Sequence, residues 1–138
     1  MKLFTTTLAT LAIGISTALA GGEGWMTDLD AALEKSKSEN KPVLIEFTGS
    51  DWCPPCMMMS EKVFSKKEFT EEASKKFILV ELDFPKGDRE LAEKNQPHAK
   101  EYKINGFPTV VLLDEEQKEF QRFIASRYPS IDCVSLQS

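Results

Sequence analysis

The sequence has little cysteine and almost no histidine. Its 138 residues include three cysteines, Cys53, Cys56 and Cys133, and one histidine, His98. Small scaffolds held together by disulfides use more cysteines than this, and in even numbers. A closed tetrahedral zinc site needs four cysteine or histidine ligands, and the chain has no second cysteine or histidine pair to supply them. The composition therefore excludes a disulfide-rich scaffold and a zinc ribbon.

An excess of basic residues is also absent. The chain has 17 Lys and Arg against 22 Asp and Glu, for a formal net charge of −5. Without the first twenty residues, whose only charged side chain is Lys2, 16 basic residues face 22 acidic ones and the net charge is −6. Nucleic acids and anionic membranes attract positive charge. The charge balance therefore disfavours both as partners.

No apolar run reaches the roughly 20 residues that a membrane-spanning helix needs. The run "LATLAIGI" at 8–15 is too short, but it follows Lys2 and precedes "ALA" at 18–20, a small-x-small cleavage pattern. These features predict a signal peptide over residues 1–20 and a mature domain over 21–138. We expect the mature protein to be periplasmic or secreted and not inserted in a membrane.

The apolar patterning after residue 20 predicts alternating helices and strands. Helices are expected at 27–40, 53–64, 66–77, 88–102 and 128–138, and strands at 41–48, 77–84, 109–114 and 118–125. Pro97 lacks an amide hydrogen and should break or kink its helix near Asn95. Cys133 is expected to be a small apolar contact of the last helix. The order predicts one α/β domain, with parallel pairing through helical crossovers and a closing antiparallel hairpin.

Two cysteines two residues apart follow the first predicted strand, in "GSDWCPPC" at 49–56. A helix N-terminus carries unpaired amides and partial positive charge, which stabilise a thiolate and lower the pKa of the first cysteine below about 8.5. We expect Cys53 to be exposed and to attack a substrate disulfide. Cys56, one turn further and more buried, would resolve the mixed disulfide. The spacing favours a redox dithiol over a structural disulfide or two inert thiols.

The motif "IEFTGSDWCPPC", followed about fifty residues later by "GFPT", resembles the thioredoxin superfamily, particularly exported members with a "WCxxC" active site. The resemblance implies a thioredoxin-like fold, with a central mixed sheet of about four to five strands and helices on both faces. It also implies a cis peptide bond at Pro108, which would leave the backbone at Phe107 free to pair with a substrate strand. Trp52 matches the aromatic residue that flanks the family's active site.

Glu46, on the strand before the motif, resembles the buried acid that thioredoxins use to move a proton to or from the resolving thiol. A buried carboxyl group has a raised pKa and can act as a general base nearer neutral pH. The sequence departs from the family in two ways here: the acid is Glu rather than the commoner Asp, and the connection "TGSDWC" is one residue longer. A carboxylate that reaches solvent at the strand end is the alternative interpretation of Glu46.

These features predict a thiol-disulfide oxidoreductase that acts on protein thiols and disulfides, needs no cofactor and is recycled by a redox partner protein. Potentials in this chemistry span roughly −270 to −120 mV, so the sequence leaves the direction of exchange open. A non-enzymatic Cu(I)-binding or delivery module is the alternative, with Cys53, Cys56 and a nearby methionine as soft ligands. Consecutive helical residues point about 100° apart, so at least one of Met57, Met58 and Met59 should pack against the sheet instead. A degenerate fold that serves only as an interaction module is a third possibility.

Overall fold

The computed structural model describes residues 22–124. The expected signal peptide at 1–20, the expected terminal helix at 128–138 and Cys133 lie outside the described residues. The elements within them, in chain order, are α1 (Leu29–Glu39), β1 (Val43–Thr48), α2 (Pro54–Met59), the π-helix η1 (Ser60–Phe64), α3 (Lys67–Lys76), β2 (Ile78–Asp83), α4 (Arg89–Glu101), β3 (Thr109–Leu113) and β4 (Glu119–Ile124). No helix within this range combines the length and the apolar character needed to cross a membrane.

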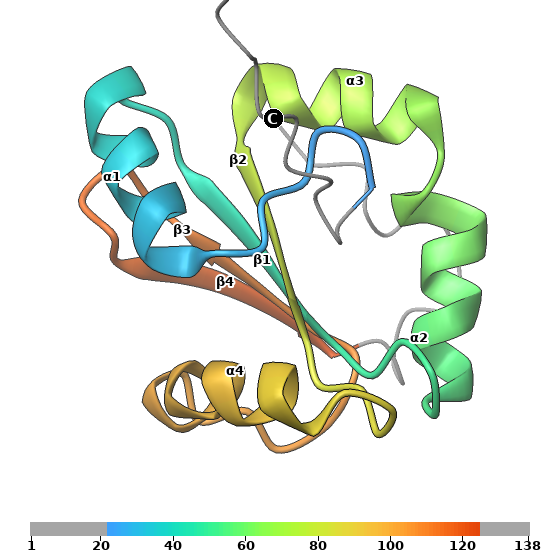
Figure 1. The fold of residues 1–138 in the computed structure, drawn as a ribbon. Helices are drawn as coiled ribbons and strands as arrows, with labels where there is room; N and C mark the ends of the chain where they lie inside the picture. The colour runs from blue at the N-terminus through green and yellow to red at the C-terminus, as the bar shows by residue number, and fades with distance from the viewer. Residues whose placement is uncertain (1–21, 125–138) are drawn as a thin grey trace, which may run out of the picture.

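The four strands form one mixed sheet in the order β2-β1-β3-β4. β1 pairs with β2 in parallel, whereas β3 is antiparallel to both β1 and β4. Helices cover both faces, with α1 and α4 on one side and α2, η1 and α3 on the other (Figure 1). The mixed four-stranded sheet, the parallel crossover and the closing hairpin are all as the sequence predicts.

Alternate residues of β1 face opposite sides of the sheet, as the period of a strand requires. Val43, Ile45 and Phe47 join the core that includes residues of α1 and α4. Leu44 joins the core that includes residues of η1 and α3. Glu46, two residues after Leu44, therefore also faces the side that carries α2, η1 and α3.

The expected break near Asn95 is wrong, because α4 continues through both Asn95 and Pro97. Pro97 is exposed, and its ring removes a single backbone donor. Buried residues anchor the helix on either side of it. The Asn95 side chain donates a hydrogen bond to the Asp83 carbonyl oxygen at 2.8 Å, and Ala99 is buried in the core. These tertiary contacts anchor the helix on both sides of Pro97.

The expected single helix over 53–64 is divided between α2 and η1. In η1 the Ser65 amide donates to the Ser60 carbonyl oxygen, five residues earlier, at 2.8 Å. The wider turn accompanies the burial of the consecutive residues Val63 and Phe64. Met59 packs against the same core, as expected for at least one of the three methionines. Met57 and Met58 are exposed by 42% and 48%, so most of the methionine run does not pack inward.

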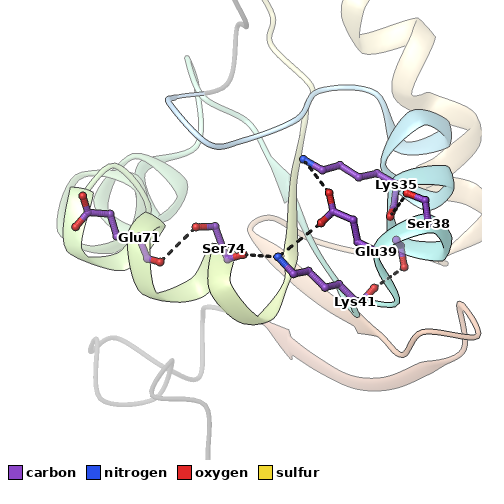
Figure 2. Close-up of polar contacts among 7 residues, drawn as sticks. Lys35, Ser38, Glu39, Lys41, Glu71 and Ser74 are labelled. Atoms are coloured by element: carbon purple, nitrogen blue, oxygen red, sulfur yellow. Dashed lines mark hydrogen bonds and ion pairs between the residues drawn. The ribbon is translucent and has the colours of Figure 1, made fainter.

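A lysine joins the ends of α1 and α3 at the end of the sheet where β1 begins (Figure 2). The Lys41 ammonium group donates to the Ser74 carbonyl oxygen at 3.2 Å and lies 3.6 Å from the Glu39 carboxylate. The Ser36 hydroxyl donates to the Lys41 carbonyl oxygen at 2.5 Å. Lys41 precedes β1, so this junction lies at the opposite end of the strand from the cysteine pair.

Candidate active site

The cysteine pair lies at the start of α2, directly after the turn that ends β1. The backbone amides of Trp52 and Cys53 both donate to the Gly49 carbonyl oxygen, at 3.3 and 3.0 Å, and this closes the turn. Cys53 is extended and caps α2, while Pro54 and Pro55 occupy the first helical positions, where their missing amides cost no hydrogen bond. Cys53 and Cys56 are joined as a disulfide, with 5.2 Å between their Cα atoms.

Both cysteines are buried, and the burial differs from expectation at Cys53. Cys56 is fully buried, and the Gly49 amide donates to its sulfur at 3.4 Å. Only 4% of the Cys53 surface is exposed, so the expectation of an exposed Cys53 is wrong for this disulfide state. The expected order, with Cys53 the more accessible of the two, is confirmed. Cys53 is buried because its sulfur is covalently bound to that of Cys56, which lies inside the first turn of the helix.

The segment "GFPT" supplies the opposite side of the site. The Phe107–Pro108 peptide bond is cis, as the resemblance implies, and Pro108 is buried. The rings of Trp52 and Phe107 meet edge to face, with 5.7 Å between their centroids. The Thr109 hydroxyl donates to the Gly106 carbonyl oxygen at 2.7 Å and holds the turn. Trp52 and Phe107, far apart in the sequence, are therefore brought together beside the disulfide.

The longer connection before Cys53 is hydrogen-bonded to the end of β2 and to the loop that follows it. The Ser50 amide and hydroxyl donate to the two carboxylate oxygens of Asp83, at 2.9 and 2.5 Å. The Asp51 carboxylate accepts hydrogen bonds from the amides of Lys86 and Gly87, at 2.9 and 2.7 Å. These backbone donors hold the pKa of Asp51 below its usual range. We call this set of hydrogen bonds the Ser50–Asp51 clamp.

Trp52, the residue before Cys53, contacts the same loop as the clamp. The Trp52 indole N–H donates to the Phe84 carbonyl oxygen at 2.8 Å, and the Lys86 ammonium lies 5.2 Å from the centroid of the Trp52 ring. Sequence reasoning assigned no role to Ser50 or Asp51. The signal available was the length of "TGSDWC", since the residues that lengthen this connection provide the polar groups of the clamp.

Glu46 is buried behind the disulfide and does not reach solvent. Its side chain is 1% exposed, and its Oε1 atom has no hydrogen-bond partner among the described residues. Burial is the main reason why the pKa of Glu46 is raised well above its ordinary value, and the nearby charges of Glu81 and Asp83 raise it further. The structure therefore supports the buried-acid interpretation of Glu46 over a solvent-exposed carboxylate.

A cavity of about 260 Å³ is lined by both Glu46 and Cys56. Its lining residues are Glu46, Thr48, Ser50, Cys56, Met57, Ser60, Glu61 and Glu81. Glu81 was not expected at the site. The available signal is that "VLIEF" and "ILVEL" each carry a glutamate at the same point of an apolar strand, but only the strand register shows that the two meet. The parallel register makes Glu46 and Glu81 direct partners.

Within residues 22–124, no group of three or more His, Cys, Asp and Glu side chains is arranged to hold a metal ion. The soft-ligand alternative depends on methionine as well, and Met57 lines the same cavity as Cys56. In the structure the two cysteine sulfurs are bonded to each other. A Cu(I) site on these sulfurs would therefore require the reduced protein.

Comparison with known proteins places these features in a family. The family model described as Thioredoxin-like matches residues 24–115. The chain is 40% identical over 94 residues to the disulfide bond reductase DsbH of Chlamydia pneumoniae and 35% identical over 101 residues to the thioredoxin-related protein DsbJ of the same organism. These alignments cover 66% and 71% of this chain, but 57% of DsbH and 29% of DsbJ.

Two solved structures show the same fold. A structure described as DsbH Oxidoreductase superposes with a TM-score of 0.65 and 35% identity, covering 88% of this chain and 82% of that one. A thioredoxin from Thermus thermophilus superposes with a TM-score of 0.62 at 22% identity, covering 81% and 82% of the two chains. With the family model matching most of residues 22–124 and the sheet, the cis bond and the cysteine pair in place, the chain belongs to the thioredoxin-like family.

Proposed function

We propose that this protein is a thiol-disulfide oxidoreductase that reduces disulfides of other proteins through Cys53 and Cys56. The observation that carries the proposal is the disulfide at the start of α2, in a fold that also has a cis bond before Pro108 and a contact between Trp52 and Phe107. A homologue named as a disulfide bond reductase supports the reducing direction. A thiolate at a helix start is stabilised by the unpaired amides there, which favours the dithiol form.

The reaction conserves electrons and protons in two exchanges. The Cys53 thiolate attacks one sulfur of a substrate disulfide; a Cys53–substrate disulfide forms, and the other substrate sulfur leaves as a thiolate that takes up a proton. Cys56 then loses its proton and attacks the Cys53 sulfur. The Cys53–Cys56 disulfide forms, and the second substrate sulfur leaves and is protonated. The protein is oxidised by two electrons and the substrate disulfide is reduced to two thiols.

We assign the substrate-binding side of the site to Trp52, Phe107 and Pro108. The assignment is supported by the cis bond at Pro108 and by the contact of the Phe107 ring with Trp52, the residue before Cys53. An extended substrate segment would pair with the backbone at Phe107, while the aromatic rings contact apolar side chains that flank the substrate disulfide. Protein thiols and disulfides are therefore the expected partners, together with a redox protein that recycles the Cys53–Cys56 pair.

Trapping variants test the roles of the two cysteines. Cys56→Ser should accumulate mixed disulfides through Cys53 in an extract, whereas Cys53→Ser should not. Wild-type protein with dithiothreitol should reduce insulin, and both variants should lose at least about 10-fold in rate. Equal trapping by the two variants would contradict the assignment of Cys53 as the attacking residue. Absence of insulin reduction by the wild type would contradict the oxidoreductase itself.

We further propose that the protein is exported, on the strength of the basic, apolar and small-residue pattern of residues 1–20. A cell-fractionation experiment with mass spectrometry tests this. The expected species begins at Gly21 and is recovered from the periplasm or the medium of a bacterial host. Recovery of the complete chain from the cytoplasm alone would contradict export.

Titration of the reduced protein with Cu(I) tests the copper alternative. Met57 is exposed and lines the cavity behind Cys56, so it is the methionine placed to join the two sulfurs. An oxidoreductase predicts turnover of insulin and no loss of it when Met57 is replaced by Leu. Tight one-to-one Cu(I) binding that needs Met57, without turnover, would favour a copper-binding module instead.

A further inference from the structure

Two carboxyl groups on neighbouring strands face the cavity behind the disulfide. Glu46 of β1 and Glu81 of β2 are direct partners in the parallel register, and both line the cavity that Cys56 lines. Paired strands lie about 4.8 Å apart, and register partners project from the same face of the sheet. The two carboxyl groups are therefore neighbours on the cysteine side of the sheet.

No cation neutralises these two acids within the cavity. Among the described residues that line it, none is a lysine, an arginine or the histidine. A buried carboxyl group beside a lysine would stay ionised, because the opposite charge lowers its pKa. Two carboxyl groups side by side behave differently. They hold one proton between them over a wide pH range and titrate in two steps that belong to the pair.

The other charged or titratable groups near this pair are Asp83 from β2, Glu61 from η1 and, in the reduced protein, the thiol of Cys56 from α2. Of these, the nearby charge of Asp83 raises the pKa of both glutamates further. Burial raises the pKa of Glu81 to about 7, with a further contribution from Asp83. Burial raises the pKa of Glu46 as well. Glu46 is fully buried whereas Glu81 is half-buried, so Glu81 is the member of the pair nearer to solvent.

We propose that Glu46 and Glu81 act as one proton-sharing pair that carries the proton of the Cys56 thiol to solvent, with Glu81 as its solvent-side member. The proposal rests on the thiol-disulfide exchange proposed above, and it adds Glu81 as a residue of that reaction. Most of the residues that line the cavity are polar, and its volume is several times the space that one water needs, so water can connect the carboxyl groups to Cys56. The unpartnered Oε1 of Glu46 is an acceptor available for such a water.

The proton transfer belongs to the second exchange of the reaction. The S–H bond of Cys56 breaks, and its proton passes to the ionised member of the carboxyl pair. The Cys56 thiolate attacks the Cys53 sulfur, the Cys53–Cys56 bond forms, and the substrate sulfur leaves with the electron pair of the broken bond. The carboxyl pair then releases the proton to solvent from Glu81. A pair that titrates near neutral pH is matched to this transfer, because it accepts and releases protons at that pH.

A carboxyl-carbon NMR titration of the oxidised protein tests the coupling directly, without turnover. In the wild type, Glu46 and Glu81 should titrate in two steps that both signals report. In Glu81→Gln the titration of Glu46 should move to lower pH by about one unit or more, because a neighbouring negative charge has been removed. Glu61→Gln is the matched control, since its exposed carboxylate lines the same cavity and should leave both steps in place. A titration of Glu46 that is unmoved by Glu81→Gln would overturn the pair.

Rapid mixing with a chromogenic aryl disulfide tests the role in the reaction. Attack by Cys53 releases one coloured thiolate and resolution by Cys56 releases the second, so the two steps are separated. Near neutral pH, Glu81→Gln should slow the second release by on the order of 10-fold or more, within the range of general acid-base effects. The first release should stay within about threefold, in the Cys56→Ser background as well. Glu61→Gln should alter neither step.

The outcomes separate this proposal from the function on which it rests. A second release that is equally fast in Glu81→Gln and wild type across the pH range would overturn the proton-carrying role while leaving the oxidoreductase intact. Absence of both releases in the wild type would overturn the oxidoreductase. The NMR titration would still decide whether the two carboxyl groups share a proton. Thermal unfolding of each variant verifies that the compared proteins are folded.

Discussion

The ring of Trp52 stands edge-on against the ring of Phe107, with 79° between the ring planes. The contact joins the residue before Cys53 to the residue before Pro108. Phe107 in turn contacts Phe84, with 5.2 Å between the ring centroids, and the Phe84 carbonyl oxygen accepts the indole N–H of Trp52. Three aromatic residues from three loops thus fix the spacing between the disulfide and the cis bond.

Gly49→Ala should disturb this arrangement. A Cβ atom at residue 49 would lie 2.5 Å from Cε2 of the Trp52 indole, closer than van der Waals contact allows. Because the site is buried, we expect the free energy of unfolding to fall by about 1–3 kcal/mol, the usual cost of overpacking. Urea denaturation followed by tryptophan fluorescence measures it. Gly106→Ala is the control, since its Cβ would meet no atom within 4 Å, and an equal loss there would contradict a specific clash.

Asp51→Ala should remove a pH-dependent contribution to stability. The folded-state pKa of Asp51 is lowered by the amides of Lys86 and Gly87, so the ionised carboxylate stabilises the fold. This contribution is present above the unfolded pKa of about 3.9 and is lost as pH falls through the folded pKa. The stability difference between wild type and variant should therefore shrink under acidic conditions. Glu115→Ala, at an exposed turn residue, should show no such trend in the same urea titrations.

Glu46→Leu should stabilise the protein most at high pH. The folded-state pKa of Glu46 is raised, so the stability of its neutral form is fully present below the unfolded pKa of about 4.3 and is lost as pH rises through the folded pKa. Leucine avoids that loss and suits a position next to the apolar cluster of Leu44. We expect a gain of about 1–3 kcal/mol at mildly alkaline pH and a smaller one near pH 4.

The control for Glu46→Leu is Glu34→Leu, at an exposed position of α1, where no gain of this kind should occur. Guanidinium unfolding at several pH values provides the comparison. A variant at residue 46 that loses stability as pH rises, relative to the wild type, would contradict an unpartnered buried acid. If Glu46→Leu is more stable than the wild type but exchanges disulfides more slowly, Glu46 contributes to the reaction at a cost in stability.

Pro97→Ala should stabilise α4. The helix runs through residue 97, so alanine supplies the missing amide donor and has a better helix propensity. Alanine also increases the freedom of the unfolded chain, which offsets part of the gain. We expect a net increase of about 1–2 kcal/mol in the free energy of unfolding. Pro85→Ala, in the loop after β2, should give no increase, and a loss at residue 97 would show that the ring contributes packing.

Local patterns predict most of this fold. The apolar runs that become β1, β2 and β3 are recognisable because buried strands need continuous apolar sequence. The Asp28 side chain caps α1 by accepting the Ala31 amide at 3.0 Å, and Asp is among the residues that favour this position. The strand-to-helix junction at Cys53 follows from the same reasoning. These features depend on residues close together in the sequence.

The parts that were missed depend on residues far apart in the sequence. The helix that continues through Pro97 is anchored by the hydrogen bond between Asn95 and Asp83, and the clamp joins Asp51 to the loop after β2. Glu81 was missed for the same reason, since only strand register brings it to Glu46. Spacing alone does not report such pairings, because a shift of register by one residue would move Glu81 to the other face.

The junction made by Lys41 has a practical consequence. It fastens α1 to α3 at the end of β1 that precedes Val43, and a six-residue strand of about 20 Å lies between it and the turn before Cys53. Chemical attachment near this end, for example at the exposed Lys37, would leave the disulfide facing away from the support. Attachment through Lys37 should therefore orient the molecule on an electrode or a sensor chip, with the Cys53–Cys56 disulfide toward the solution.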